Sequence, residues 1–246
     1  MRGRSFRRSP TAPKLPLWYE RDGGLRLAHD RALLNRLHPQ LSYGVDPETG
    51  LVCLRGSLEY RLACNVPTRV AVRIVFPPDY PRCEPTAYDD GNRFPHVADR
   101  HFYPSGRCCL WLPPESIWKP GDSDALVGYV DQVALFFDRQ LVCEAQPTHR
   151  RIQWPGGGRG HGIAGYLEYV RDVLGGDEGT VAALTPVLVG RRRIGRNRQC
   201  PCGSTRKYKK CHLTPVERAR RTFSADELTR LMDYMRISPR DGRAAI

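Results

Sequence analysis

The sequence predicts an α+β protein in which helices gather against one antiparallel sheet. Apolar residues first repeat with the spacing of a helix, then alternate with the spacing of strands, and later return to helical spacing. Turn residues separate the strand-like segments and favour a meander. Between the strands and the later helices, residues 89–122 follow neither period. Because irregular stretches of that length inside a domain are commonly functional, the site is expected there.

The first elements are a helix and a meander of strands. A helix is expected over 18–37, although Gly23 and Gly24 weaken its start. The β-branched and aromatic segments predict strands at 41–45, 51–60, 69–76 and, as a short fourth, 85–89. DPETG, residues 46–50, has the composition of a hairpin loop. One face of the third strand carries Val70, Val72, Ile74 and Phe76.

The second half of the chain is mainly helical. The best helix covers 123–141 and can be capped by Asp122 or Ser123. Its apolar stripe consists of Leu126, Val130, Val133, Phe137 and Leu141. A glycine-rich segment at 154–162 lacks the Lys-Ser/Thr of a phosphate-binding loop and is interpreted as a linker or surface loop. Another helix is expected at 163–175.

Composition places the chain among soluble, cytoplasmic proteins. It has 246 residues, of which 40% are hydrophobic, so a core can form. No apolar run approaches the ~20 residues that span a bilayer, and the basic N-terminus lacks the apolar stretch of a secretory signal. The nine cysteines are odd in number, which argues against a disulfide scaffold. Core packing, metal ligation and catalysis remain as their expected uses.

The charge is concentrated towards the C-terminus. The formal net charge is +13; residues 191–246 hold 16 Lys and Arg against 5 Asp and Glu, whereas the first 190 residues hold 23 against 21.

Five segments are expected along the chain: a basic arm at 1–16, a main domain at 17–175, a linker at 176–193, a zinc knuckle at 194–213 and a C-terminal helical segment at 214–246. A Ser-x-x-Glu capping box at Ser224 opens the final helix. The cationic tail is either a docking surface for an acidic protein or nucleic acid, or a solvated face.

Two segments make up the expected site. FPPDYPRCEP, residues 76–85, carries four prolines, which restrict the backbone of this loop so that it can pack under an irregular active-site segment. PSGRCCLWLPPESIWKP, residues 104–120, carries the adjacent cysteines Cys108 and Cys109. Four explanations for these cysteines are open: buried packing, zinc binding with nearby histidines, a strained vicinal disulfide, or nucleophilic catalysis. Adjacent cysteines are not the usual spacing of a metal site.

These segments resemble the ubiquitin-conjugating enzymes. FPPDYPRCEP resembles their F-P-x-D-Y-P-x-x-P-P element, with Glu84 in place of the first of the paired prolines. GRCCL resembles their G-x-Ile-C-L signature, which aligns Cys109 with the catalytic cysteine and Cys108 with an apolar position. WKP at 118–120 resembles the Trp-x-Pro that follows, one residue later than is common. The resemblance covers residues 18–145 and extends to bacterial relatives, including those of anti-phage cyclic-oligonucleotide signalling operons.

The resemblance implies a ubiquitin-conjugating-enzyme-like fold and a thioester on Cys109. His101 stands eight residues earlier, where the family has an Asn that stabilises the oxyanion or orders the loop, and His96 is the second candidate. Glu144 and Asp138 are candidates to activate an incoming amine. The implied partner is a protein with an activated C-terminus, such as a nucleotidyltransferase or a ubiquitin-like protein. The sequence shows no nucleotide site, so adenylation is expected from another enzyme.

The most specific signal is IGRNRQCPCGSTRKYKKCH, residues 194–212. Cys200, Cys202, Cys211 and His212 give C-x-C-x8-C-H, four ligands that suit a closed, tetrahedral, structural Zn²⁺ site. The segment closely resembles the SEC-C-type motif at the C-terminus of the bacterial secretion ATPase. Zinc would stabilise a unit that is too small to fold by burial alone.

Three functions are open at this point. The first is a conjugating enzyme that carries an acyl group on Cys109 and docks through its zinc-binding tail. The second is a catalytically inactive scaffold, against which the retained Cys109 and Trp118 argue. The third is a nucleic-acid-binding protein that acts through the basic tail, with binding that weakens in salt. A base deaminase is excluded because the H-x-E and P-C-x-x-C motifs are absent.

Overall fold

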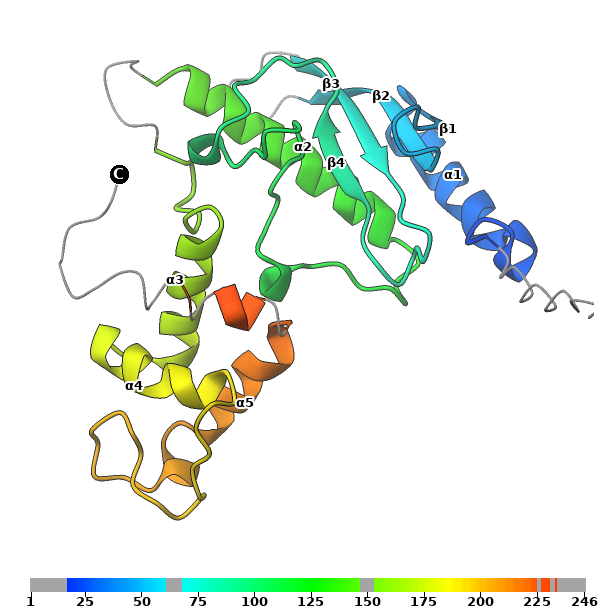
Figure 1. Cartoon of the computed structure of the whole chain (residues 1–246). Coiled ribbons are helices and arrows are strands. Elements are labelled where there is room, and N and C mark those ends of the chain that lie inside the picture. The colour runs from blue at the N-terminus through cyan, green and yellow to red at the C-terminus, as the bar shows by residue number, and fades with distance from the viewer. Residues whose placement is uncertain (1–16, 61–67, 147–152, 225–226, 231–232, 234–246) are drawn as a thin grey trace, which may run out of the picture.

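The computed structural model describes residues 17–60, 68–146, 153–224, 227–230 and 233; the expected basic arm at 1–16 lies outside them. The described chain forms two lobes (Figure 1). One lobe holds a four-stranded sheet with two helices, and the other holds three helices with the cysteine-rich segment at its far end. The predicted α+β class is confirmed.

The sheet is an antiparallel meander in the order β1-β2-β3-β4. The strands are β1 (Leu41–Val45), β2 (Val52–Tyr60), β3 (Thr68–Val75) and β4 (Thr86–Asp89), which confirms the four expected strands. Alternation along β3 buries Val70, Val72 and Ile74 in the core, as expected. The expected hairpin loop joins β1 to β2, where the Gly50 N–H donates to the Asp46 carbonyl at 2.8 Å.

Two helices of the first lobe pack with this sheet. α1 (Leu25–Leu37) begins later than expected, because Gly23 and Gly24 take φ of +68° and +80°, which a right-handed helix does not accommodate. α2 (Ala125–Glu144) buries most of its predicted apolar stripe in the core. Neither Asp122 nor Ser123 is its N-cap residue. That position is Asp124, whose own N–H donates to the Asp122 carboxylate at 3.0 Å and orders the preceding turn.

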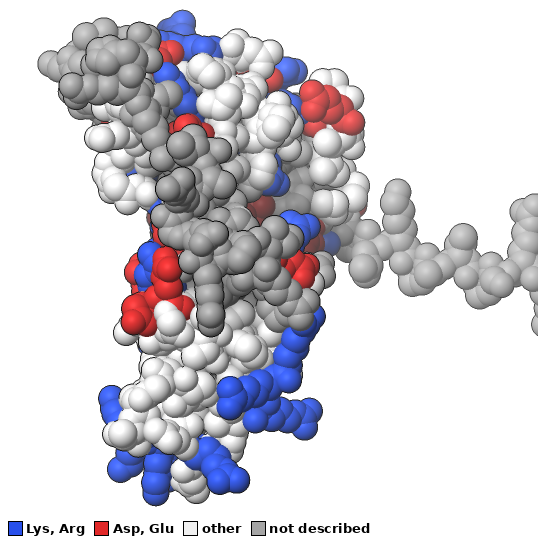
Figure 2. All heavy atoms as spheres, turned by 60° about the vertical axis from the view of Figure 1, so that its left-hand side comes forward, with Lys and Arg blue, Asp and Glu red and all other residues white. Residues whose placement is uncertain are grey.

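The second lobe consists of α3 (Ile163–Leu174), α4 (Glu178–Leu188) and α5 (Leu213–Thr222) around a separate core. Residues 176–193, which were expected to be a linker, contain α4. Its apolar side chains, which a proline and two threonines interrupt in the sequence, pack against α3 and α5: Val181, Leu184, Val187 and Leu188. Exposed Lys and Arg side chains stand out from the far end of this lobe (Figure 2).

The C-terminal end of the described chain confirms the capping box. The Ser224 N–H donates to the Glu227 carboxylate at 2.8 Å, and the Glu227 N–H donates to the Ser224 hydroxyl at 3.2 Å. The rest of the expected helical segment, beyond residue 233, lies outside the described residues. Within the part of the chain that the structure describes, no helix is long and apolar enough to cross a membrane.

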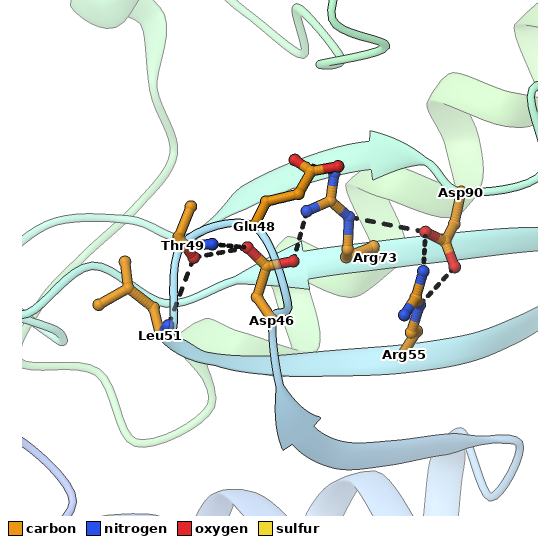
Figure 3. Close-up of polar contacts among 7 residues, drawn as sticks. All are labelled: Asp46, Glu48, Thr49, Leu51, Arg55, Arg73 and Asp90. Carbon is orange, nitrogen blue, oxygen red and sulfur yellow. Dashed lines mark hydrogen bonds and ion pairs between the residues drawn. The ribbon is translucent and has the colours of Figure 1, made fainter.

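A cluster of charged side chains fixes the strand that leads into the long loop (Figure 3). Arg55 on β2 and Arg73 on β3 are directly opposed, and Asp90 stands between them. Arg55 donates to both carboxylate oxygens of Asp90, at 2.6 and 2.8 Å, while Arg73 pairs with Asp46 of the hairpin loop. Opposed guanidinium groups repel each other. The carboxylates of Asp90 and Asp46 offset this repulsion and so hold β2 and β3 together. The loop from 90 onwards therefore starts from a fixed position.

Candidate functional site

The proline-rich loop packs against the segment that follows the paired cysteines, as expected. Tyr80 is fully buried, and its ring contacts those of Phe76 and Trp118. The Trp118 indole N–H donates to the carbonyl of Pro81 at 2.9 Å. The buried aromatic rings and this hydrogen bond hold the segment after Cys109 over the proline-rich loop.

Glu84, which departs from the family pattern, also holds that segment. Its carboxylate accepts hydrogen bonds from the Trp111 indole at 3.2 Å and from the Ser116 hydroxyl at 2.5 Å. A proline at this position would have no side-chain acceptor, whereas the Glu84 carboxylate anchors the residues just beyond Cys109.

The residues before the cysteines are held by backbone pairing. The Cys108 N–H donates to the Ala87 carbonyl at 2.9 Å, and the Cys109 N–H donates to the His101 carbonyl at 2.8 Å. Phe102 and Cys108 form an isolated bridge between the two arms of the loop. Because consecutive side chains of an extended segment point in opposite directions, Cys108 and Cys109 face different surroundings.

Cys108 and Cys109 accordingly differ in burial. Cys108 is 7% exposed within the hydrophobic core, and burial raises the pKa of its thiol well above the usual value. Cys109 is half-buried and lies between two cavities of about 180 and 140 Å³. Both cysteines are free thiols, so the vicinal disulfide is not formed. Cys108 also lines the larger cavity, whereas Cys109 lines both cavities and is less buried, so Cys109 is the more accessible of the two thiols.

The pKa of Cys109 reflects opposing influences. Partial burial raises it, while the positive charge of Arg107 and a hydrogen bond with Tyr103 lower it. The Arg107 guanidinium stacks 3.7 Å from the centre of the Tyr103 ring, which holds both groups beside the cysteine. Because the net shift is upward, most of the thiol is protonated at neutral pH, and the thiolate forms with help from these two residues.

Replacing Tyr103 by Phe is expected to raise the pKa of Cys109 further, since a hydrogen bond to the thiolate is removed. The pH profile of iodoacetamide alkylation at Cys109 should move up by about one unit, the typical worth of a hydrogen bond to a charged group. Tyr166→Phe is the matched control, because Tyr166 lines the same cavity but bonds Glu227. Equal shifts in the two variants would contradict the assigned role of Tyr103.

The two candidate histidines occupy different environments. His101 lines the smaller cavity with Cys109, and its ring centre lies 4.5 Å from that of Trp154. Burial and the neighbouring His161 and Arg139 lower the pKa of His101 to about 4, so the ring is neutral at physiological pH. It can donate one hydrogen bond there but does not supply a positive charge.

His96 packs against other residues of the long loop and lines neither of the two cavities beside Cys109. Its Nε2 lies 3.2 Å from the Asp89 carboxylate, and its ring packs on that of Phe102. A Cβ at Gly106 would come within 2.7 Å of the His96 ring, so the imidazole fills the space that this glycine leaves. These contacts favour a structural role for His96.

The two candidate bases on α2 lie outside the cavities at Cys109. Glu144, at the end of α2, pairs with Arg93 at 3.3 Å, and neither it nor Asp138 lines either cavity. The structure therefore gives no geometric support to a role for these carboxylates at Cys109.

The sequence did not indicate that residues within 154–166 line the two cavities beside Cys109. Gly162 and Tyr166 line the larger cavity, and Trp154 lines the smaller one. The His161 ring contacts those of Tyr103 and His101, with ring centres 4.9 and 6.0 Å apart. All four belong to the glycine-rich segment or to the helix after it, and no local pattern connects a surface loop to a cysteine more than forty residues earlier.

The second candidate site is a cluster of four metal-ligating side chains. One ligand atom from each of Cys200, Cys202, Cys211 and His212 lies within 4.8 Å of all the others. The Cys202 and Cys211 sulfurs are 3.7 Å apart, close to the ~3.8 Å expected of two thiolates on a tetrahedral zinc ion. His212 Nδ1 lies 3.2 Å from the sulfurs of both Cys200 and Cys211. The residues present therefore fit a closed site for a metal such as zinc.

Neighbouring groups orient these ligands. His212 Nε2 lies 2.9 Å from the carbonyl of Leu174, so an N–H at Nε2 leaves the Nδ1 lone pair facing the sulfurs. The Ser204 hydroxyl lies 3.2 and 3.3 Å from the sulfurs of Cys202 and Cys211. Because Leu174 ends α3, the histidine ties the ligand cluster to that helix.

Comparison with known proteins supports the metal-binding assignment. The SEC-C motif model matches residues 196–214. The chain is 39% identical over 75 residues to the protein translocase subunit SecA of Ectopseudomonas mendocina (strain ymp), covering 30% of this chain and 8% of that protein. It is 62% identical over 37 residues to SecA of Myxococcus xanthus (strain DK1622), covering 15% and 4%. The chain thus spans less than a tenth of the length of these relatives.

Among solved structures, one neighbour aligns with about half of the chain. It is the yeast Vps23 UEV domain in complex with a Vps27 PSDP peptide, at 16% identity and a TM-score of 0.35. The alignment covers 47% of this chain and 81% of that one. This similarity is too weak to assign a fold, and the architecture of the first lobe is defined by its own strands and helices.

Proposed function

We propose that the chain is a cysteine-dependent acyl carrier of the ubiquitin-conjugating type. The observation that carries this proposal is the difference in burial between the paired cysteines on a loop fixed at both ends: Cys108 is buried in the core and lines only the larger cavity, whereas Cys109 is half-buried and lines both cavities. The motif resemblance described above places the nucleophile at the same residue. The proposed setting is bacterial anti-phage defence, on the strength of that resemblance.

The proposed reaction has two transfers. The Cys109 thiolate attacks the activated C-terminal carbonyl of a partner protein, a C–S bond forms, and the leaving group departs with its electron pair. An acceptor amine then attacks the thioester, the C–S bond breaks, and the proton of the amine passes to solvent. Tyr103 and Arg107 stabilise the Cys109 thiolate, both when it forms before the first attack and when it leaves the thioester in the second transfer.

Transfer from a synthetic peptide bearing a C-terminal thioester tests this proposal without a natural partner. The purified chain is expected to take the peptide onto Cys109, as a mass adduct that a thiol reductant removes, and to release it to added lysine. Cys83 is the internal comparison because it is exposed but lies outside both cavities. An adduct on Cys83 with none on Cys109 would contradict the proposal and favour a scaffold.

His101 is proposed to donate a hydrogen bond to the oxyanion of the tetrahedral intermediate. His101→Ala should then lower the transfer rate roughly a hundredfold, the usual cost of one such donor. His101→Asn should keep much of the activity because it keeps a donor. Since the pKa of His101 is about 4, its titration should not affect transfer rates between pH 6 and 8. An alanine variant as active as the parent would leave His101 with loop ordering alone.

The four-residue cluster is proposed to hold one structural Zn²⁺. Three thiolates and one imidazole suit that ion, and a closed set of four protein ligands leaves no position for a substrate. The role proposed for the metal is therefore to stabilise the second lobe.

A further inference from the structure

Exposed cations gather at the end of the second lobe and are called its basic face here. It is formed by Arg191, Arg192, Arg193, Arg196, Arg198, Arg206, Lys207, Lys209 and Lys210, all of them exposed. Backbone contacts bring the two runs of cations side by side: the Lys209 N–H donates to the Arg196 carbonyl at 2.9 Å, and Gln199 bridges to Lys207. The same pairing holds the metal ligands, so the metal site fixes the spacing of these charges.

This face lacks acidic neighbours. No Asp or Glu occurs in the sequence between Glu178 and Glu217. Within the described residues, no ion pair involves any of the nine cations. On the side shown in Figure 2, the Lys and Arg side chains stand out from this end with no acidic side chain among them. Apart from the Arg206 guanidinium, which donates to the Lys210 carbonyl, no side-chain hydrogen bond or ion pair of the described residues uses these charges, so they are available to a partner.

The basic face also lacks the features of a protein interface. The large apolar side chains that are exposed among the described residues all lie at or before Val142. Tyr208 is the one aromatic residue between 191 and 211, and it is buried. Protein interfaces draw most of their affinity from buried apolar and aromatic anchors, and single-stranded nucleic acids use exposed aromatic rings for base stacking. Among the described residues of this face, neither kind of group is present.

We propose that the basic face binds the phosphate backbone of double-helical nucleic acid, without sequence readout. Regularly spaced phosphates need only cations at fixed positions, six of which are arginines able to make paired hydrogen bonds to phosphate. This binding site is separate from Cys109 and goes beyond the proposed acyl transfer. It would bring the acyl carrier to a nucleic-acid surface.

The affinity is expected to depend steeply on salt. If about half of the nine cations bind phosphates, the slope of log K against log salt is about −4. Raising the salt from 50 to 200 mM should then weaken binding roughly 250-fold. The probes are a 20-base-pair DNA duplex and the RNA duplex of the same sequence, measured by fluorescence anisotropy with the full chain. The two duplexes tell which helix geometry the face prefers.

Substitution of the cations provides the decisive comparison. Lys207→Ala/Lys209→Ala/Lys210→Ala should weaken duplex binding at least tenfold and flatten the salt slope by about one unit for each phosphate that a lysine no longer neutralises. The matched control removes three exposed cations of the first lobe, Arg36→Ala/Arg82→Ala/Lys119→Ala, and should bind as the parent does. Zinc content, measured alongside, checks that the lysine variant keeps its fold. Equal binding by the parent and the lysine variant would overturn the proposal.

An acidic protein is the competing partner, and polyglutamate is its probe. The duplex should bind much more tightly than polyglutamate at equal concentration of negative charge, because the phosphate spacing matches fixed cations. Displacement of the duplex by polyglutamate at equal charge would overturn the nucleic-acid assignment in favour of an acidic protein surface. The activity of Cys109 enters neither measurement, so failure here is distinguishable from failure of the proposed acyl transfer.

Discussion

Cys109→Ala is expected to abolish the thiol-cleavable adduct with a peptide thioester, whereas Cys108→Ala is expected to retain it. The two thiols are adjacent in sequence, but Cys108 is packed in the core and lines only the larger cavity, whereas Cys109 is less buried and lines both. Burial raises the pKa of the Cys108 thiol far more strongly, so little thiolate forms there. Cys109→Ser should trap a more stable ester, which a thiol reductant does not remove.

The control for this experiment is the folding of the Cys108 variant. Removing a buried sulfur should cost about 1 kcal/mol of stability and leave a cooperative unfolding transition. A Cys83→Ser background removes the exposed thiol that competes for the peptide. Because Cys108 and Cys109 fall on one proteolytic fragment, the substitutions are needed to tell them apart. Loss of the adduct in Cys108→Ala and survival in Cys109→Ala would shift the nucleophile by one residue.

The sheet of the first lobe was predictable because its signals are local and agree with one another. Val70, Val72 and Ile74 alternate with other residues along β3, and the turn at 46–50 separates two strand-like segments. Burial of one face of a strand fixes its register, so the pattern alone determines which side chains enter the core.

The elements that the sequence did not predict are ones that tertiary contacts define. In α4, Pro186 and Gly179 weaken the helical signal, and the stabilisation comes from packing against α3 and α5. The start of α2 moved to Asp124 because a turn closed by the Asp122 carboxylate precedes the helix. Neither feature follows from the propensity of single residues.

The two candidate sites differ in how far the sequence could describe them. The four metal ligands lie within thirteen residues of one another, so spacing and donor chemistry were sufficient. The cavity at Cys109 is different, because Tyr166 and Gly162 come from the second lobe. The packing of the lobes brings these walls to the cysteine, and a one-dimensional pattern does not contain that information.

Removal of zinc is expected to unfold the second lobe and to expose Cys109. Structural zinc contributes about 10–16 kcal/mol in small peptides with such ligands, which rivals the total stability of an ordinary domain, about 5–15 kcal/mol. Here Cys200 is also part of the core that α3, α4 and α5 share. The double variant Cys200→Ser/Cys202→Ser should therefore lose zinc and the helical signal of these three helices, while the sheet of the first lobe survives.

Helix α3 connects the two sites and carries the effect to Cys109. At its C-terminal end, the Leu174 carbonyl accepts a hydrogen bond from His212. At its N-terminal end, Gly162 and Tyr166 form part of the cavity wall beside Cys109. When the second lobe unfolds this wall is removed, so alkylation of Cys109 by iodoacetamide should become faster in the zinc-free chain and in the double variant.

Three measurements separate these steps: zinc by atomic emission, helix content by circular dichroism and, in a Cys108→Ala background, alkylation of the fragment that carries Cys109 by mass spectrometry. Cys83→Ser is the matched control, since it removes an exposed thiol outside the ligand set and should change none of the three. A full zinc complement in the double variant would overturn the ligand assignment. Loss of zinc with unchanged alkylation at Cys109 would show that the cavity wall holds without the metal, and would leave the two sites independent.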